Sequence, residues 1–228
     1  MERLDDLQHN GLMLYQDTDY ARFNADALLL LGFLRLTKRD TAVELGSGTG
    51  VICVLGADVF GCSFTGVEPQ QHLVELSQKS ARQNGQSIQF VCQTAVGAPD
   101  ALGRGRFTAA VMNPPYYAEG DRSGNPSVAL SRHAAFGVLE EFLAAAFALL
   151  DNGGKLYLIY PASALCDLFA SLRAHRLEPK RMRFASARAG ENAARVLLEA
   201  KKLGKTGLVV EPPILFQTQP GDAPVHAE

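Results

Sequence analysis

Short apolar runs alternate along the chain with longer stretches in which apolar residues recur every three or four positions. A short run bounded by turn residues predicts a buried strand, and a longer periodic stretch predicts an amphipathic helix. The predicted strands are 41–46, 62–68, 87–93, 109–113, 155–161, 180–186 and 194–202, and the predicted helices between them are 50–60, 69–85, 138–154 and 163–176. This alternation predicts an α/β fold with a doubly wound, mostly parallel, seven-stranded sheet. Because no long helix separates the last two strands, they predict an antiparallel C-terminal hairpin at the sheet edge.

The chain has 228 residues, which is enough for one domain with a sizeable core. We expect residues 1–217 to form that single domain, with 1–39 as a lead-in segment and helix and 40–217 as the α/β core. Residues 218–228 are expected to be a disordered tail. The lead-in helix is predicted over Ala25–Leu36.

The longest apolar run, Ala25 to Leu34, is too short to span a bilayer. The N-terminus lacks the apolar stretch behind positive charges that a signal peptide has. We therefore expect a cytoplasmic protein without a membrane partner.

Four cysteines stand singly, each inside or beside an apolar stretch: Cys53, Cys62, Cys92 and Cys166. They form no C-x-x-C pair, and the five histidines are scattered along the chain. This pattern predicts buried, reduced thiols and no metal site.

The net charge of −2 is distributed unevenly along the chain. Residues 173–205 carry 10 Lys and Arg against 3 Asp and Glu, whereas residues 1–172 carry 12 against 18. An acidic body with a basic block can steer a polyanion to one face. The alternative is that these Lys and Arg residues are only the solvated faces of a helix and strands.

A glycine-rich turn, "ELGSGTG", lies between the first core strand and the following helix. Gly46, Gly48 and Gly50 allow a sharp turn and a close approach of a ligand to the backbone, with Ser47 between the first two. The spacing G-x-G-x-G, followed by Val51, differs from the G-x-G-x-x-G of dinucleotide folds, which disfavours an NAD-dependent oxidoreductase.

Two acidic residues flank this turn. Glu44 lies just before it, where a carboxylate would repel phosphate and suit an ammonium group. Glu68 ends the next strand, 22 residues after Gly46, where a carboxylate can accept both hydroxyls of a ribose. S-adenosylmethionine carries both groups and fits these demands. A purely structural turn is the alternative.

The stretch "VMNPPYY" places Asn113 at the end of the fourth core strand, 63 residues beyond Gly50. The carboxyl ends of parallel strands form the ligand crevice, so Asn113 is expected beside the glycine turn. Pro114 and Pro115 lack amide hydrogens, and Tyr116 offers an aromatic face on which a flat substrate can stack. The Asn113 side-chain oxygen and the Pro114 carbonyl are expected to accept the two hydrogens of a conjugated amine. A rigid turn is the alternative.

The glycine turn with Glu68 resembles the cofactor loop of class I methyltransferases, and N-P-P-Y resembles the amino-methyltransferases within that Rossmann-like class. Three further stretches resemble a bacterial family that methylates adenine N6 beside the anticodon of a valine tRNA. They are "YARFNADALLLLGFL", "SRHAAFGVLEEFLAAA" and "ARVLLEAKKLGKTGLVVEPPILF", so the resemblance covers about residues 12–217.

The resemblance implies S-adenosylmethionine as cofactor, an adenine of tRNA as substrate and N6 as the methylated atom. It implies that Arg22 and Phe23 close over the cofactor and that Asp26 supports their segment. It also implies that Tyr116 forms the floor of the adenine pocket and that the basic segment 173–205 contacts RNA.

Three positions depart from this family. Gln93 and Thr94 stand where an Asp commonly holds the cofactor adenine, so Thr94 is the candidate there; Thr108 and Ala134 replace two further common acids. A non-catalytic RNA-binding protein with a methyltransferase fold therefore remains an alternative. A protein-glutamine N5 methyltransferase is another, although only about forty residues precede the glycine turn, too few for the helical N-terminal domain of the release-factor enzymes.

Overall fold

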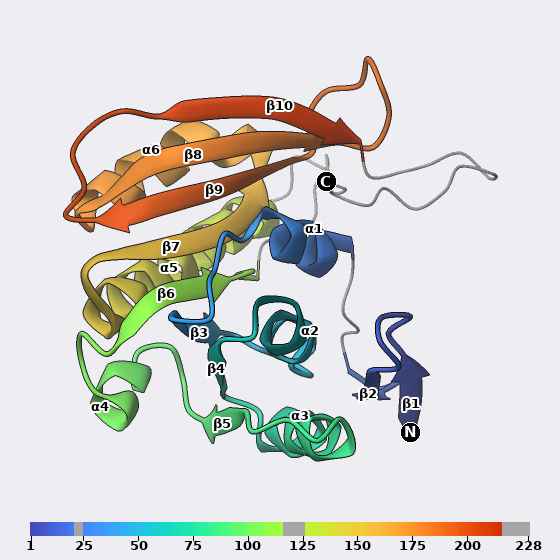
Figure 1. Cartoon of the computed structure of the whole chain (residues 1–228). Coiled ribbons are helices and arrows are strands. Elements are labelled where there is room, and N and C mark those ends of the chain that lie inside the picture. The colour runs from blue at the N-terminus through green and yellow to red at the C-terminus, as the bar shows by residue number, and fades with distance from the viewer. Residues whose placement is uncertain (21–24, 116–125, 216–228) are drawn as a thin grey trace.

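A computed structural model describes residues 1–20, 25–115 and 126–215, and within helix α5 it describes the side chains only from residue 137 onward. An eight-stranded sheet forms its centre (Figure 1). The strand order is β10 (Val209–Leu215), β8 (Leu177–Ser186), β9 (Arg195–Lys202), β7 (Leu150–Pro161), β6 (Phe107–Met112), β3 (Thr41–Leu45), β4 (Ser63–Glu68) and β5 (Gln89–Cys92).

Most strands of this sheet run in one direction. β5, β4, β3, β6 and β7 pair in parallel, β9 is antiparallel to both β7 and β8, and β10 is parallel to β8. The doubly wound, mostly parallel sheet with an antiparallel pair of C-terminal strands is therefore confirmed. We call the side of the sheet at which the parallel strands β3 to β7 end the carboxyl edge, and the side at which they begin the far edge. Neither name refers to the outermost strands, β5 and β10.

The sheet has one strand more than the sequence predicted. β10 covers β8, so the hairpin of β8 and β9 does not lie at the edge of the sheet. Its pairing with β8 shifts register between Glu211 and Ile214, where Pro212 and Pro213 interrupt the run. Prolines are typical of an edge strand because they have no amide hydrogen to donate.

Helices cover both faces of the sheet (Figure 1). On one face lie α1 (Ala25–Phe33), α2 (Val51–Phe60) and α3 (Gln71–Gln83), and on the other lie α5 (Pro126–Leu149) and α6 (Leu165–Ala174). Two short turns complete the fold, α4 (Ala98–Leu102) and the 3-10 helix Ala162–Ala164. The helix after the glycine turn lies where it was predicted, whereas α1 ends three residues before the predicted Leu36.

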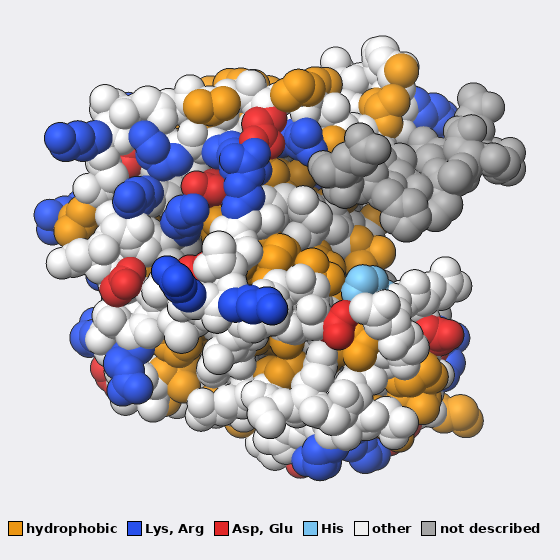
Figure 2. Space-filling model, viewed as in Figure 1, with side chains coloured by type: hydrophobic (Ala, Val, Ile, Leu, Met, Phe, Trp, Pro, Cys, Tyr) orange, Lys and Arg blue, Asp and Glu red, His pale blue; other side chains and the backbone are white. Residues whose placement is uncertain are grey.

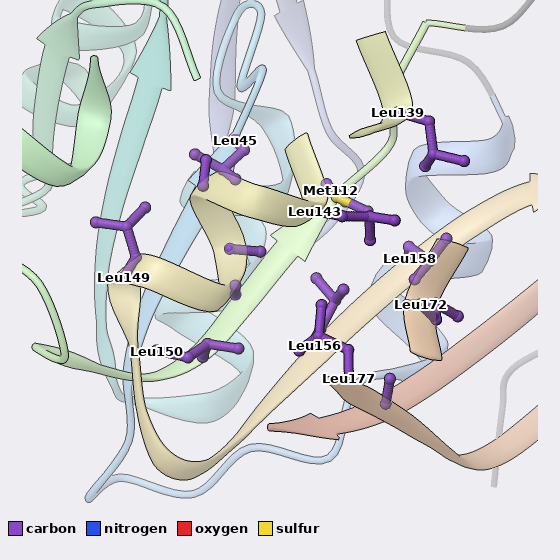
Figure 3. Close-up of a cluster of buried hydrophobic side chains, with 14 of the residues drawn as sticks. Leu45, Met112, Leu139, Leu143, Leu149, Leu150, Leu156, Leu158, Leu172 and Leu177 are labelled. Atoms are coloured by element: carbon purple, nitrogen blue, oxygen red, sulfur yellow. The ribbon is translucent and has the colours of Figure 1, made fainter. Parts of the chain in front are cut away.

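Alternate residues of each strand feed two hydrophobic clusters. In β6, Ala110 and Met112 join the cluster under α5 and α6, and Ala109 and Val111 join the cluster under α1, α2 and α3. Figure 3 shows the first cluster, in which leucines of α5 and α6 meet side chains of β3, β6 and β7. A strand buried on both faces explains the continuous apolar run seen in the sequence.

The N-terminal segment forms an antiparallel hairpin of β1 (Glu2–Asp6) and β2 (Met13–Asp17), which the sequence did not predict. β2 packs on α3, where the Met13 amide donates to Asn84 Oδ1 at 2.9 Å and the Tyr15 amide donates to Ser80 Oγ at 2.9 Å. The hairpin therefore leads the chain across α3 towards α1.

The prediction of four buried cysteines is half wrong. Cys53 and Cys62 are buried, but Cys92 and Cys166 are exposed, and all four are free thiols. Cys92 is the last residue of β5, which has only one strand beside it, so an apolar neighbourhood in sequence did not ensure burial. Across the described ranges, no helix has the length and apolarity needed to cross a membrane.

Candidate active site

The carboxyl edge brings together the glycine turn, Glu68 and Asn113. Leu45 pairs with Val67 on one side and with Met112 on the other. Gly46, Glu68 and Asn113 each follow one of these three paired residues directly. The strand register therefore places the three residues side by side at the carboxyl edge, while the ligand crevice stays a prediction.

The glycine turn depends on left-handed backbone conformations. Gly46, Gly48 and Gly50 have φ angles of +71°, +54° and +81°, a region that L-residues with a side chain rarely adopt. The amides of Gly46 and Ser47 both donate to the Val67 carbonyl, at 2.8 and 3.0 Å. These bonds fix the turn to the end of β4 and start α2 beside it.

Glu68 holds the turn from below. Its carboxylate accepts hydrogen bonds from the Gly48 amide at 3.0 Å and from the Gln70 amide at 3.1 Å, and the residue is only 5% exposed. The Gly48 carbonyl in turn accepts a hydrogen bond from Ser77 Oγ at 3.0 Å. Oε1 also accepts from the Gln70 side chain, whereas Oε2 accepts only from the Gly48 amide among the described residues, so Oε2 retains acceptor capacity for a ribose hydroxyl.

The space around the glycines fits a ligand above Gly48. A Cβ atom at Gly46 or Gly50 would meet the ring of Phe142 at 3.3 Å or of Phe90 at 2.9 Å, whereas one at Gly48 would meet nothing within 4 Å. In addition, the Ser47 hydroxyl is buried without a hydrogen-bond partner among the described residues. An open backbone surface beside an acceptor carboxylate fits the adenosine and amino-acid parts of S-adenosylmethionine.

Glu44 differs from Glu68 in its surroundings. It is 3% exposed in β3, and the Cys53 thiol donates to its carboxyl group at 2.9 Å. Burial raises the pKa of Glu44 to about 8, and the neighbouring charge of Glu68 acts in the same direction. With no positive partner among the residues that the structure describes, Glu44 is therefore mainly protonated at pH 7.

The N-P-P segment leaves the sheet at the carboxyl edge. Asn113 is half-buried, Pro114 is buried and Pro115 is exposed. The side chain of Asn113 thus starts from a fixed strand end and has partial access to solvent. Tyr116 lies outside the described residues, as do Arg22 and Phe23.

Asp26 and Thr94 occupy positions at the same edge. Asp26 is buried in the first turn of α1 and accepts a hydrogen bond from Arg195 Nε at 3.0 Å. Thr94 is exposed, and its hydroxyl accepts a hydrogen bond from the Gly97 amide at 3.2 Å just before α4. Thr94 therefore supports the turn after β5.

Two contributors were missed by sequence reasoning. Arg195 reaches Asp26 from 169 residues away, a separation at which no local pattern indicates contact. Gln70 follows the acid at the end of β4, and its side-chain amide also donates to Glu68, at 3.2 Å. A Gln two residues after the acid at a strand end was the only available signal.

The basic segment 173–205 does not form one surface. Arg181 is buried in ion pairs with Glu199 and Glu211. Lys202 Nζ donates to the carbonyl of Phe147 near the end of α5, at 2.7 Å, and to that of Leu150 at the start of β7, at 2.6 Å. With Arg195 bound to Asp26, these cations stabilise the fold and are not free to bind a partner.

Comparisons with known proteins agree with this architecture. The methyltransferase small domain family matches residues 19–168. A tRNA1(Val) (adenine(37)-N6)-methyltransferase of Aeromonas hydrophila is 25% identical over 184 residues, which cover 78% of this chain and 75% of that protein. Its namesake from Porphyromonas gingivalis is 27% identical over 149 residues, covering 61% of this chain and 57% of that protein.

Solved structures share the fold. An Agrobacterium tumefaciens protein described as a predicted O-methyltransferase superposes with a TM-score of 0.70 at 21% identity, covering 88% of this chain and 91% of its own. The T. thermophilus 16S rRNA N2 G1207 methyltransferase, in complex with AdoMet and guanosine, superposes with a TM-score of 0.62 at 20% identity. The superposition covers 89% of this chain and 50% of that methyltransferase. The chain belongs to the methyltransferase small domain family, whose enzymes use S-adenosylmethionine as methyl donor, and it has the class I methyltransferase fold.

Proposed function

We propose that this methyltransferase transfers a methyl group from S-adenosylmethionine to the exocyclic N6 amine of an adenine in tRNA, in the anticodon loop. The observation that carries the proposal is the position of Asn113, one residue beyond Met112, which pairs with Leu45 beside the glycine turn. Distant relatives, 25% and 24% identical, are named as adenine-N6 methyltransferases of a valine tRNA. The proposed substrate places the activity in the cytoplasm.

The residues at the carboxyl edge divide the work of binding. The Gly46–Gly50 turn would hold the amino-acid part of the cofactor, and Glu68 would accept the ribose hydroxyls. Glu44 can provide a negative charge near an ammonium group once that group restores its ionised form. When bound, S-adenosylmethionine supplies an electrophilic methyl group on a sulfonium centre.

Asn113 and Pro114 act on the acceptor amine. The amine of adenine is a poor nucleophile because its lone pair is delocalised into the ring. When the Asn113 side-chain oxygen and the Pro114 carbonyl each accept one of its hydrogens, the nitrogen becomes more tetrahedral and its lone pair more localised. The methylated nitrogen is strongly acidic and loses its extra proton to solvent, so positioning and oriented dipoles replace a strong base.

The test is methyl transfer from labelled S-adenosylmethionine to unmodified bulk tRNA, with digestion of the product to nucleosides. We expect labelled N6-methyladenosine from the wild-type chain and a rate of labelling lower by roughly a hundredfold or more from Asn113→Ala. Label in protein instead of RNA would favour glutamine methylation. Absence of both label and cofactor binding would favour a non-catalytic RNA-binding protein.

A further inference from the structure

The strand register divides the basic segment 173–205 between opposite edges of the sheet. Arg195 pairs with Pro161, the last residue of β7 at the carboxyl edge, whereas Lys201 pairs with Lys155, nearer the start of β7. Six residue steps of a strand span about 20 Å. Cations that are neighbours in sequence therefore lie far apart in the molecule.

Among described residues, the cations of this segment at the carboxyl edge are paired. Arg195 is bound to Asp26, and Arg188 lies 3.6 Å from Glu191. Paired cations attract a polyanion weakly because their field is cancelled at short range. In the described part of the carboxyl edge, segment 173–205 therefore contributes little unpaired positive charge that could attract a polyanion.

Six exposed cations gather at the far edge instead, and none has an ion-pair partner in the described part of the chain. They are Lys38, Arg39, Arg106, Arg176, Lys201 and Lys205, and we call them the far-edge basic surface. Figure 2 shows Lys and Arg side chains gathered on the side of the molecule where β6 and β7 begin and β9 ends. The carboxylates of the same region are fewer: Asp40, Asp151 and Glu178.

These cations come from separate parts of the chain that the sheet aligns. Lys38 and Arg39 precede β3, Arg106 precedes β6, and Lys201 is the penultimate residue of β9. Since these strands are near neighbours in the order β3, β6, β7, β9 and β8, and each spacing is about 4.8 Å, the row extends about 20 Å. Such a row matches the extended charge of a nucleic-acid backbone.

One end of the row is a preformed hollow of about 390 Å³, lined by Arg173, Arg176, Glu178, Leu203 and Gly204. Arg176 and Leu203 have φ angles of +57° and +56°, which are unusual for residues with a side chain. The Leu203 amide donates to the Arg176 carbonyl at 2.9 Å and fixes both turns. The backbone of Arg176 is thereby fixed beside this hollow, whose other two charged side chains, Arg173 and Glu178, pair with each other at 2.9 Å.

We propose that the far-edge basic surface binds the sugar–phosphate backbone of the RNA whose target base enters the carboxyl edge. The inference rests on the proposed function, because it takes RNA as the substrate. Phosphate contacts of this kind add affinity and orientation without reading sequence. Since the two edges lie about 20 Å apart, only an RNA that extends well beyond its target loop engages both.

The experiment compares two triple variants of the full chain. Arg106→Ala, Arg176→Ala and Lys201→Ala remove three cations of the far-edge basic surface. Arg3→Ala, Lys79→Ala and Arg82→Ala remove three cations from β1 and α3. Arg3 and Arg82 are exposed and Lys79 is half-buried, and Arg3 and Lys79 are paired with Asp5 and Glu2. Equilibrium binding of fluorescent unmodified tRNA is measured over a range of salt concentrations, and the melting temperature and S-adenosylmethionine affinity of each variant are measured as controls.

We expect the first variant to bind tRNA at least about tenfold more weakly at low salt, with a salt slope smaller by roughly 2 because each lost phosphate contact removes about 0.7–0.9. The second variant should match the wild type. The loss of affinity in the first variant should be smaller for a hairpin limited to the anticodon loop than for complete tRNA. Unchanged tRNA affinity and salt slope in the first variant overturn the inference. Equal competition by polyglutamate also overturns it, because an acidic protein would then suit the surface as well.

Binding and methylation fail separately. If the wild-type chain binds tRNA through this surface but transfers no methyl group to it, the proposed function is wrong and the inference that the far-edge basic surface binds RNA is supported. If the chain methylates tRNA with the same affinity in both triple variants, the proposed function stands and the surface fails. If the wild-type chain does not bind tRNA at all, both fail. Replacing the same three cations with Glu should weaken binding further, which separates loss of charge from loss of packing.

Discussion

Asn113 is the side chain on which the proposed chemistry depends. It is held by the end of a strand that is buried on both faces, and Pro114 after it is buried as well. Its amide oxygen thus has a fixed origin, and the proposed chemistry asks for a fixed dipole instead of a proton acceptor of particular pKa.

Replacement of Asn113 by Ala should lower kcat by roughly a hundredfold or more, since loss of one preorganised polar contact to a reacting group has effects of this size. The affinity for S-adenosylmethionine, measured by calorimetry, should change by less than about threefold. Asn152→Ala, at an exposed residue of β7 near the far edge, serves as the control. Full turnover by Asn113→Ala would falsify the assigned role.

Glu44 leads to a pH prediction. Its pKa is raised from 4.5 to about 8 in the folded chain because the carboxyl group is buried. Between these values the unfolded chain has an ionised Glu44 and the folded chain a protonated one, so stability falls as pH rises, by at most about 1.4 kcal/mol per pH unit. When the free energy of unfolding is measured with urea between pH 5 and 8, Glu44→Gln should lack the part of the pH-dependent decrease that Glu44 causes.

The control for this measurement is Glu75→Gln, at an exposed residue of α3. It should keep the pH dependence of the wild type. If Glu44→Gln and the wild type lose stability in parallel from pH 5 to 8, Glu44 is already ionised in the folded chain.

Sequence reasoning at this scale located Gly46, Glu68 and Asn113 because strand ends and turn residues are local signals. It did not reveal that Glu44 is neutral, because burial of a carboxyl group depends on everything packed around it. It also did not find the partner of Asp26, because contact across the sheet has no local signature.

At the scale of elements, the turn between β3 and α2 allows the effect of a substitution on backbone strain to be distinguished from its effect on ligand binding. Gly48 and Gly85 both have positive φ angles, +54° and +64°, and a Cβ atom on either would meet nothing within 4 Å. Gly85 lies after α3, away from the crevice. The two glycines therefore impose similar backbone strain when replaced, with different consequences for a ligand.

Gly48→Ala and Gly85→Ala should each cost about 1 kcal/mol of stability, the usual strain of Ala in this conformation. Only Gly48→Ala should weaken S-adenosylmethionine binding, by more than about tenfold, since its methyl group fills the space proposed for the ligand. Thermal melting measures the strain and calorimetry measures the binding. Equal cofactor affinity in the two variants would place the ligand elsewhere.

The elements that sequence reasoning missed share a physical reason. The hairpin of β1 and β2 has charged residues on exposed positions and depends on contacts with α3, including Asn84. β10 carries two prolines in the middle of a strand and has mostly exposed side chains. Both are elements stabilised by neighbours, whereas the core strands are marked by their own apolar runs.

Across the whole molecule, Arg181 links three strands and one helix. It pairs with Glu199 of β9 at 3.1 Å and with Glu211 of β10 at 3.2 Å, and it donates to the Phe33 carbonyl at the end of α1 at 2.7 Å. Its guanidinium also lies 3.7 Å from the centroid of the Phe33 ring. These contacts join the lead-in helix to the C-terminal strands.

Arg181→Ala should destabilise the chain by about 3 kcal/mol or more, because it leaves two carboxylates in buried surroundings without their central partner. Arg35 pairs with the same Glu211, but its side chain is 64% exposed. Arg35→Ala should therefore cost less than about 1 kcal/mol. Urea unfolding measures both; similar losses in the two variants would show that burial does not govern this network.

The order of the strands was the least accessible property of the chain. The sequence indicates which segments are strands, and the chirality of crossovers restricts how they connect. That β10 should lie beside β8 depends on Glu211 reaching Arg181, a contact made only after both strands are in place.

The two prolines of β10 also bear on how copies of this chain meet one another. Val209 and Val210 are 60% and 59% exposed and lie on β10, the outermost strand of the sheet. An exposed apolar strand at this position can pair with a strand of another molecule. Pro212 and Pro213 remove two amide hydrogens there and interrupt the register. The same irregularity that hid β10 in the sequence thus protects the sheet from growing by aggregation, and a chain with Ala at both positions would lose that protection first in concentrated solution.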